Sequence, residues 1–454
     1  MKNLKIYFTS DLHGYVYPTD YIDRSQKNIG LLNIINQFEK DGNTLIIDAG
    51  DTIQGSPFTN YLSTAEFDVH PIATIFNKAG YDYITLGNHD FNYGFDYLKK
   101  YLCNLDAKCL CANVDDKTNE LGIFPYDIKT LENGLKVGII GFTTDFINIW
   151  ERAENLANFT INDTISSIKP YYDELKGNVD VLIGVYHGGF EYDLDSHKKL
   201  SETKENVAYK ICHELGFDLL TGHQHMEISD IDLHGTHIVQ TPHNGSKFIE
   251  LNLEFDNDQI QKVTSKLIDV ELSPNKEMYD KFLPLEEKVQ QWLDTPVGFL
   301  DTELQPSAHL DMALNGSSLA NFINQIQLSE SGADIACTSF ANVIKGFEKN
   351  VTVRDIMSTY PYPNTLVVYE VNRKYLELAL ERCASYFDFK DGEVTISDRF
   401  LKPKVEHYNY DYFANLNYTF DITKEVGNRV TSIVYNGKEL DHGTTLKLVM
   451  NNYR

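Results

Sequence analysis

The stretch Thr44-Leu45-Ile46-Ile47-Asp48-Ala49-Gly50-Asp51-Thr52 joins an apolar run to a compact polar cluster. The run Thr44–Asp48 is typical of a buried strand, and Gly50 permits the tight turn that follows it. Asp51 then supplies a carboxylate just beyond the carboxyl end of the expected strand. In layered α/β folds, ligands gather at that end of the strands. The stretch therefore predicts a functional site at one edge of a sheet.

The same arrangement recurs four more times along the chain. The other clusters are Asp11-Leu12-His13-Gly14, Gly87-Asn88-His89-Asp90, His187-Gly188-Gly189 and Gly222-His223-Gln224-His225. Each follows a strand-like run and offers carboxylate, imidazole or amide oxygen as a metal ligand. A single Asp-x-His is usually a turn, but five clusters in one chain predict a site for two divalent metal ions. Mixed oxygen and nitrogen ligands favour manganese, zinc, iron, cobalt or nickel over calcium.

Strands and helices alternate over residues 1–255, which indicates α/β layers. The expected strands are Lys5–Ser10, Thr44–Asp48, Tyr83–Leu86, Lys136–Phe142, Val179–Tyr186, Leu219–Thr221 and Thr236–Gln240. We interpret residues 256–300 as a linker region with a connecting helix at 274–294, which Pro284 should kink or split. Residues 301–454 form an expected α+β domain whose last strand pattern stops abruptly, which suggests a truncated polypeptide.

Helix and turn signals continue in this second region. Leu314–Gln327 and Arg373–Tyr386 are expected helices, and Thr365–Val371 and Asn417–Asp421 are expected strands. The dipeptide Asn436-Gly437 predicts a hairpin turn between Val430–Tyr435 and the later run Thr445–Met450.

Charge and cysteine usage limit the class of protein. A net charge of −26 over 454 residues argues against DNA, RNA or anionic membranes as partners, because these need basic patches. Small phosphorylated substrates remain compatible, since bound metals reverse the local potential. No run approaches the ~20 apolar residues of a membrane span. We expect a cytoplasmic protein or, alternatively, an exported one whose signal was removed. Cys109 and Cys111 are expected to be buried thiols in a reducing compartment rather than zinc ligands.

The order of the five clusters resembles the calcineurin-like metallophosphoesterases. The wider strings Asp48–Pro57 and Gly87–Gly94 narrow the resemblance to the bacterial 5′-nucleotidase family, especially its 2′,3′-cyclic-nucleotide 2′-phosphodiesterase/3′-nucleotidase branch. Residues 332–335, 360–366 and 451–454 resemble that branch's substrate domain. The resemblance implies a two-layered β-sandwich flanked by helices, which is a four-layer α/β/β/α arrangement, followed by an α+β nucleotide-binding domain.

The resemblance also implies a role for each site residue. One metal would be held by Asp11, His13, Asp51 and His225, and the other by Asp51, Asn88, His187 and His223, so that Asp51 bridges the two ions. His89 would stabilise the transition state and assist the leaving oxygen. The 5′-nucleotidase members carry aspartate three residues later, where this chain has Asn92, and that departure favours the cyclic-nucleotide branch. An amide can still orient an imidazole, although it stabilises the cation less.

The implied activity is metal-dependent hydrolysis of nucleotide phosphate esters, expected for 2′,3′-cyclic nucleotides and 3′-nucleotides. The expected mechanism is in-line attack of a metal-bridging hydroxide. A 5′-nucleotidase or UDP-sugar hydrolase is the alternative within the superfamily, and a non-catalytic nucleotide-binding protein is the alternative outside it. Tyr362 matches one of the family's base-stacking rings, and Asn342 is a candidate substrate contact. The expected partner is a small nucleotide. His243 could line the site, and Asp48 and Asp90 could orient ligand histidines or cap turns.

Overall fold

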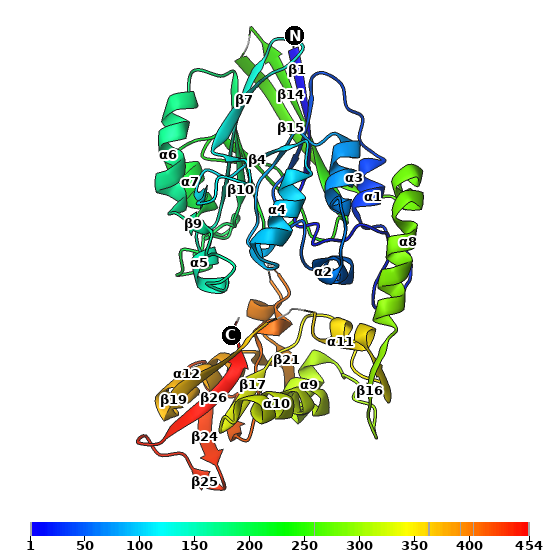
Figure 1. Ribbon diagram of the computed structural model, residues 1–454. Helices are drawn as coiled ribbons and strands as arrows, with labels where there is room; N and C mark the ends of the chain where they lie inside the picture. The colour runs from blue at the N-terminus through cyan, green and yellow to red at the C-terminus, as the bar shows by residue number, and fades with distance from the viewer. Residues whose placement is uncertain (1, 258, 362–363, 391, 403, 453–454) are drawn as a thin grey trace. The chain divides into compact units, whose positions relative to one another are not determined.

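The computed structural model describes residues 2–257, 259–361, 364–390, 392–402 and 404–452, and the chain divides into two compact units, Met1–Trp292 and Leu293–Arg454. Figure 1 shows the elements of each unit. Among the described residues, no helix combines the length and apolar character needed to cross a bilayer. All six cysteines are free thiols, and Cys109 and Cys111 are buried, as expected.

Two sheets form the first unit. The first sheet has the strand order β15-β14-β1-β2-β3-β4-β6, and the second has the order β12-β13-β11-β10-β8-β7. The strands of the first sheet are β1 (Lys2–Thr9), β2 (Thr44–Asp48), β3 (Tyr83–Ile84), β4 (Lys108–Leu110), β6 (Ile123–Phe124), β14 (Lys247–Asp256) and β15 (Gln259–Asp269). Those of the second are β7 (Tyr126–Thr130), β8 (Lys136–Thr143), β10 (Val181–His187), β11 (Leu219–Gly222), β12 (Ile228–Leu233) and β13 (Thr236–Gln240).

One buried core lies between the two sheets. Ile6 of β1 and Ile139 of β8 belong to the same apolar cluster. Side chains alternate between the faces of a strand, so Phe142 of β8 points the other way and packs with Ile168 and Ile211. These two residues come from α6 (Thr164–Leu175) and α7 (Ala208–Glu214).

Other helices lie on the opposite side of the strands. In Figure 1, α1 (Leu31–Ile35), α3 (Pro71–Ala79) and α4 (Phe95–Cys103) lie on the side away from α6 and α7. The predicted four-layer sandwich is therefore confirmed. The short α2 (Pro57–Thr64), α5 (Ile147–Trp150) and the ribbon of β5 (Val114–Asp116) and β9 (Phe159–Ile161) complete the unit.

The strand β15 occupies part of the range that we interpreted as a linker. It pairs antiparallel with β14 along its length and so belongs to the first sheet. The helix α8 (Lys276–Leu293) follows and is continuous through Pro284, so the proline does not split it. The Tyr17 hydroxyl donates to the Tyr279 carbonyl of α8 at 2.7 Å. Most of α8 is thereby part of the first unit.

The second unit is built on a four-stranded sheet of order β19-β26-β17-β22. Its helices are α9 (His309–Asn315), α10 (Ser318–Ser331), α11 (Val353–Thr359) and α12 (Arg373–Ala384). Its strands are β16 (Pro296–Phe299), β17 (Ile335–Thr338), β18 (Asn350–Thr352), β19 (Leu366–Asn372), β20 (Phe387–Lys390), β21 (Glu393–Ile396), β22 (Tyr412–Ala414), β23 (Asn417–Phe420), β24 (Val430–Tyr435), β25 (Lys438–Glu439) and β26 (Thr445–Asn451). The predicted α+β character is confirmed.

The predicted hairpin turn is confirmed, but the strand predicted to follow it is wrong. Asn436 and Gly437 both have positive φ, 49° and 74°, as a type I′ turn requires. The turn pairs β24 with the short β25, not with Thr445–Asn451. The latter strand, β26, pairs with β19 and β17 in the four-stranded sheet. The strand β25 consists of only two exposed polar residues, and two residues cannot show the alternating pattern by which a strand is predicted.

Candidate metal centre

The predicted ligands lie at the carboxyl ends of strands from both sheets of the first unit. Asp11, Asp51 and Asn88 follow β1, β2 and β3, while His187 ends β10, and His223 and His225 follow β11. The loops after β1 and β2 are bonded to each other. The Asp11 N–H donates to the Gly50 carbonyl at 2.9 Å, and the His13 N–H donates to the Asp51 carbonyl at 2.8 Å. The loop backbones thus hold the ligand side chains in register.

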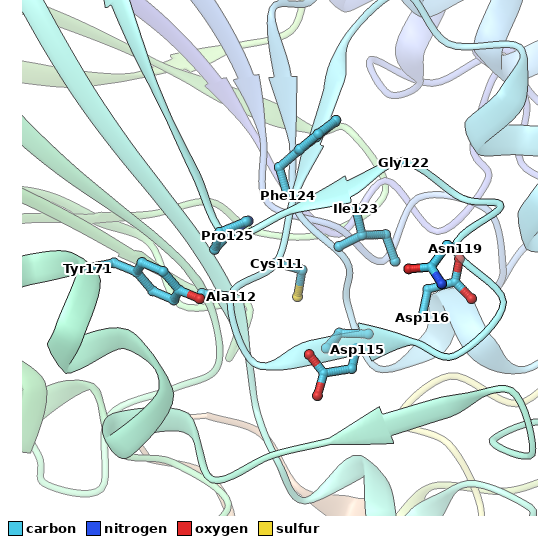
Figure 2. A pocket seen from close by; sticks show the side chains of 11 residues that line it. Cys111, Ala112, Asp115, Asp116, Asn119, Gly122, Ile123, Phe124, Pro125 and Tyr171 are labelled. Atoms are coloured by element: carbon cyan, nitrogen blue, oxygen red, sulfur yellow. The ribbon is translucent and has the colours of Figure 1, made fainter.

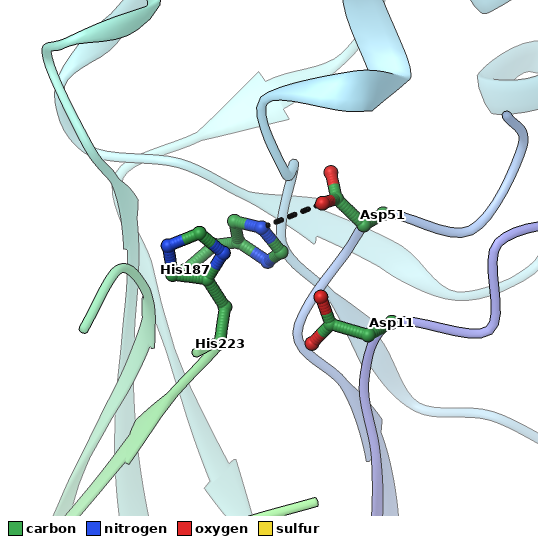
Figure 3. A group of neighbouring side chains, drawn as sticks. All are labelled: Asp11, Asp51, His187 and His223. Carbon is green, nitrogen blue, oxygen red and sulfur yellow. Dashed lines mark ion pairs between the residues drawn. The ribbon is translucent and has the colours of Figure 1, made fainter. Parts of the chain in front are cut away.

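Two overlapping groups of ligand atoms form at this edge. One group is Asp11, Asp51, His187 and His223, and the other is Asp11, His13 and His225; within each group the ligand atoms lie within 4.8 Å of one another. Figure 3 shows the two imidazoles of the first group facing its two carboxylates. The shared residue of these groups is Asp11, whereas the resemblance assigns the bridging role to Asp51.

Short distances define both groups. Oδ1 of Asp11 lies 3.0 Å from Nε2 of His225 and 3.7 Å from Nε2 of His13. Oδ2 of Asp51 lies 3.1 Å from Nε2 of His187. These contacts place anionic oxygens and imidazole nitrogens around common points, which is the donor set of a transition-metal or zinc site.

Two buried ligand atoms have no hydrogen-bond partner in the described part of the chain. They are Oδ1 of Asn88 and Nε2 of His223. A buried acceptor without a partner costs about 1–3 kcal/mol. A cation bound between these atoms would satisfy both. They belong to the residues that the resemblance assigns to the second metal, so the residues present fit such an ion.

Backbone carbonyls fix the tautomers of two histidines. Nδ1 of His187 donates to the Ala49 carbonyl at 2.6 Å, and Nδ1 of His13 donates to the Gln54 carbonyl at 3.1 Å. In the neutral ring the lone pair then lies on Nε2, which faces the carboxylates. Burial lowers the pKa of His13 and of His223 to about 3, so both rings are neutral, the form that binds metal.

The two carboxylates are fully buried and ionised. Asp11 and Asp51 are 0% and 1% exposed. Burial acts to raise the pKa of both, but the neighbouring histidines outweigh it. His225 brings the pKa of Asp11 to about 2, and His187 with His89 holds the pKa of Asp51 well below its usual range. Two buried anions require nearby positive charge.

When no metal is bound, a protonated His187 supplies this positive charge. Burial acts to lower its pKa, but the Asp51 carboxylate prevails and raises the pKa to about 9. The proton would sit on Nε2, because Nδ1 already donates to Ala49. A divalent ion held by the same nitrogen would take the place of that proton, because metal binding and proton release are coupled.

Backbone strain is concentrated at the ligands. Four of them, Asp11, His13, Asp51 and His225, have φ of 55°, 47°, 55° and 60°, in the left-handed region. Such residues cost about 1–3 kcal/mol each and persist only where the surroundings impose them. Close packing accompanies the strain, since a Cβ on Gly87 would lie 2.1 Å from Oδ1 of Asp51. The surrounding structure therefore holds these loops in a strained conformation that positions the ligand side chains.

His89 lies beside the ligand groups, in the short helix η1 (His89–Phe91). Its backbone N–H donates to Oδ1 of Asp51 at 2.7 Å, and its ring centroid lies 5.5 Å from that of His13. Nδ1 of His89 lies 2.8 Å from Oδ1 of Asn92. An amide oxygen only accepts, so Nδ1 carries a proton and donates it to Asn92.

Asp48 and Asp90 both accept hydrogen bonds from backbone N–H groups of the ligand loops. Oδ2 of Asp90 accepts the backbone N–H groups of Asp51 and Gly87, and Oδ1 accepts those of the two residues after Asp51. Asp48 accepts the Gly50 N–H at 3.0 Å. His243 is exposed, with its ring centroid 4.8 Å from that of His225, beside the second group of ligands.

The two predicted substrate contacts belong to the second unit. Tyr362 lies outside the described residues, so its role stays a prediction. Asn342 uses its amide within the unit, because Nδ2 donates to the Val405 carbonyl at 2.9 Å and Oδ1 accepts the His407 N–H at 3.1 Å. Its amide thus anchors the segment around residue 405, and its assignment as a substrate contact also stays a prediction.

A separate cavity of about 340 Å³ in the first unit shares no lining residue with the ligand groups. Figure 2 shows Asp115, Asp116 and Phe124 among its walls. The Asp116 carboxylate accepts the backbone N–H groups of Thr118 and Leu121, and the Asp115 carboxylate accepts from Asn162. Both carboxylates are engaged in local structure, so the cavity adds nothing to the metal centre.

The sequence gives no signal for one residue near the site, Glu151. Nδ2 of Asn92 donates to Oε2 of Glu151 at 2.5 Å, across 59 positions of sequence. Glu151 follows α5 in a polar segment with no motif around it. A sequence signal for this contact does not exist, because it depends on how the loop after α5 reaches η1.

Comparisons with known proteins agree with the site and the fold. The profile of the calcineurin-like phosphoesterases matches residues 4–227, and that of the 5′-nucleotidase C-terminal domain matches residues 296–454. A solved Staphylococcus aureus structure to which a 5′-nucleotidase role is ascribed is 32% identical, with a TM-score of 0.90, over 100% of this chain and 90% of that one. The chain belongs to the 5′-nucleotidase family of calcineurin-like metallophosphoesterases.

Curated members of this family extend the comparison. The 2′,3′-cyclic-nucleotide 2′-phosphodiesterase/3′-nucleotidases of Yersinia enterocolitica and Salmonella typhimurium are 25% and 26% identical. Each match covers 100% of this chain and 80% or 81% of the relative. A divalent-metal centre is a property of this metallophosphoesterase family, and the predicted family membership is confirmed.

Proposed function

We propose that the protein is a metal-dependent phosphoesterase that hydrolyses nucleotide phosphate esters, with 2′,3′-cyclic nucleotides and 3′-nucleotides as its substrates. The observation that carries the proposal is the pair of ligand groups that share Asp11 at one sheet edge, with His89 directly beside them. A two-metal donor set together with a proton-transfer residue is suited to the hydrolysis of phosphate esters.

The ligand residues hold two divalent ions in this proposal. Asp11, His13 and His225 would hold one, and Asp51, Asn88, His187 and His223 would hold the other, with a carboxylate shared between them. Manganese, zinc, iron, cobalt and nickel suit these donors. Ions bound there lower the pKa of water and neutralise charge on the phosphoryl oxygens.

His89 would move the proton of the reaction. Nδ1 keeps its own proton throughout, because Oδ1 of Asn92 accepts from it at 2.8 Å. Nε2 is then the atom that holds a proton and delivers it to the ribose oxygen as that oxygen leaves. Asn92 is an orienting residue in this scheme, since its neutral amide fixes the ring without adding a full negative charge.

The choice of substrate rests on two supports. The relatives from Yersinia enterocolitica and Salmonella typhimurium carry the cyclic-phosphodiesterase name, and the match spans the whole of this chain. Asn92 stands where plain 5′-nucleotidases carry aspartate, in keeping with the same branch. The second unit would hold the nucleoside, with Tyr362 and Asn342 as candidate contacts.

A substrate panel tests the proposal. Ring opening or phosphate release would be measured with 2′,3′-cyclic AMP, 3′-AMP, 5′-AMP and UDP-glucose, each with added manganese and with EDTA. Manganese-dependent turnover of the first two is expected. Turnover only of 5′-AMP or UDP-glucose would keep the chemistry and reject the substrate class. Nucleotide binding without turnover, in protein shown to contain both metals, would reject the enzyme and support a binding protein.

A further inference from the structure

A second carboxylate stands behind the His89–Asn92 pair. Oε2 of Glu151 accepts a hydrogen bond from Nδ2 of Asn92 at 2.5 Å, while Oδ1 of Asn92 accepts from Nδ1 of His89 at 2.8 Å. The three side chains therefore form a chain in which each link has one donor and one acceptor. None of the proposed metal ligands takes part in it.

Glu151 is itself held in place on its other oxygen. Oε1 accepts from Nδ2 of Asn155 and from the Arg152 N–H, both at 2.8 Å. Nδ2 of Asn155 also donates to the Asn92 carbonyl at 3.1 Å, so it braces the loop of Asn92 as well. A carboxylate with this many fixed donors has one orientation available, and Oε2 is directed at Asn92.

The carboxylate determines which end of the Asn92 amide faces His89. An asparagine side chain can present either its oxygen or its NH₂ group to a neighbour, with little change in shape. An ionised carboxylate only accepts, so the NH₂ group must face Glu151 and the oxygen must face His89. The imidazole is thereby kept with a proton on Nδ1, which leaves Nε2 for the proton-transfer step.

We propose that Glu151 is a positioning residue that fixes the orientation of Asn92 and, through it, the tautomer of His89. This inference rests on the proposed function for its catalytic consequence, but the tautomer itself is a property of the resting protein. Without Glu151 the amide can flip. A flipped NH₂ group would face Nδ1, favour the tautomer without a proton there, and remove the hydrogen bond that holds the ring with Nε2 in position for proton transfer.

The first test replaces the carboxylate of Glu151 by an amide of nearly the same size, which can donate as well as accept. In Glu151→Gln the new amide oxygen should keep accepting from the Arg152 N–H and from Asn155, so the new NH₂ group faces Asn92 and no longer holds its amide in the native orientation. The expected result is a fall in kcat on 2′,3′-cyclic AMP of about 10–100-fold, the scale seen when a residue that orients a catalytic group is lost. KM and the content of two metal ions should stay within twofold of wild type. Glu154→Gln, three residues along the same loop and exposed, is the matched control and should behave as wild type.

The second test exchanges the two groups. Asn92→Asp alone places two carboxylates in contact, so it should also be impaired. In Asn92→Asp/Glu151→Gln the order of donors and acceptors is restored, with a carboxylate accepting from His89 and an amide donating to that carboxylate. The double variant should exceed Asn92→Asp alone by at least about tenfold in kcat. A double variant no better than that single variant would overturn the proposal.

The third test reads the tautomer without any substrate. With ¹⁵N-labelled histidine in the metal-free protein, Nδ1 of His89 should give the signal of a protonated nitrogen, identified by its loss in His89→Ala. Glu151→Gln should convert that signal to a mixture of tautomers. An unchanged signal together with unchanged kcat would refute the role of Glu151. If wild type turns over no substrate yet the signal depends on Glu151, the proposed function fails and the positioning role stands.

Discussion

The carboxylate of Asp90 accepts the backbone N–H of Asp51 at 2.9 Å. The same oxygen accepts the Gly87 N–H at 2.8 Å, so this one side chain joins the loop after β2 to the loop after β3. Those two loops carry Asp51 and Asn88, which are both assigned to the second proposed metal. Asp90 therefore fixes the spacing of two ligand residues, although it is not itself a proposed metal ligand.

Asp90→Asn tests that link. The new NH₂ group would face N–H donors, so we expect a loss of about 2–3 kcal/mol in unfolding free energy and a metal affinity lower by about 10–100-fold. Denaturation in EDTA and manganese titration measure the two effects. Asp106→Asn, an exposed aspartate of the same unit, is the control. Unchanged metal affinity would show that the loops keep their spacing without Asp90.

Asp51→Ala should remove bound metal and nearly all activity. Asp51 is 1% exposed and contacts both His187 and the backbone of His89, so its loss removes one of the two carboxylates from the group that contains His187 and His223. Elemental analysis after dialysis gives the metal content, and the panel above gives the rate. Asp106→Ala should keep both. Two retained ions in Asp51→Ala would exclude a bridging or shared role for this carboxylate.

His223→Ala and His225→Ala should separate the two metals. The two residues are two positions apart but belong to different ligand groups. Each variant should therefore keep one ion per chain after dialysis, and the double variant should keep none. Loss of both ions from either single variant would mean that the groups bind cooperatively as one centre.

His89→Ala should separate chemistry from metal binding. The ring of His89 belongs to neither ligand group, so two ions should remain bound. The rate should fall by about 10²–10⁴-fold, the usual contribution of a proton-transfer residue. A good leaving group such as p-nitrophenolate should reduce the loss, because it needs no protonation. Metal loss in this variant would move His89 from catalyst to ligand.

Metal concentration should set the stability of the first unit. An ion that binds only the folded chain adds about 1.4 kcal/mol per bound ion for each tenfold rise in free metal above the dissociation constant. Unfolding followed in buffered manganese should show this slope. Asp51→Ala should show a flat line over the same range. A flat line for wild type would mean that the ligand groups do not bind manganese.

Most of the site could be predicted because its residues directly follow apolar runs that are typical of strands. Asp51 and His187 each follow a continuous apolar run, and parallel strands bring carboxyl ends within one sheet to the same edge. Because the two residues belong to different sheets, their meeting also depends on how the sheets pack against each other. The strained backbone of Asp11 and His13 is not visible in the sequence, but the glycines beside the clusters signal tight turns. Local pattern and global topology thus agree at these positions.

The misses have a different physical origin. Gln259–Asp269 alternates weakly, with Lys and Gln on its exposed face, and becomes a strand only because β14 is there to pair with it. Lys438–Glu439 is similarly a strand by pairing alone. Glu151 is part of the site only through a contact 59 residues away in sequence. Features that arise from long-range contacts leave no local pattern to detect.

The metal ligands come from two sheets that are built at different times. Asn88, the last of the ligands from the first sheet, is separated from His187 by about a hundred residues, and β1 lacks its partner β14 until residue 256 has been made. A nascent chain thus carries Asp11, His13 and Asp51 before His187, His223 and His225 have been made. The complete set of ligands therefore exists only after residue 225 has been made and the two sheets have packed together.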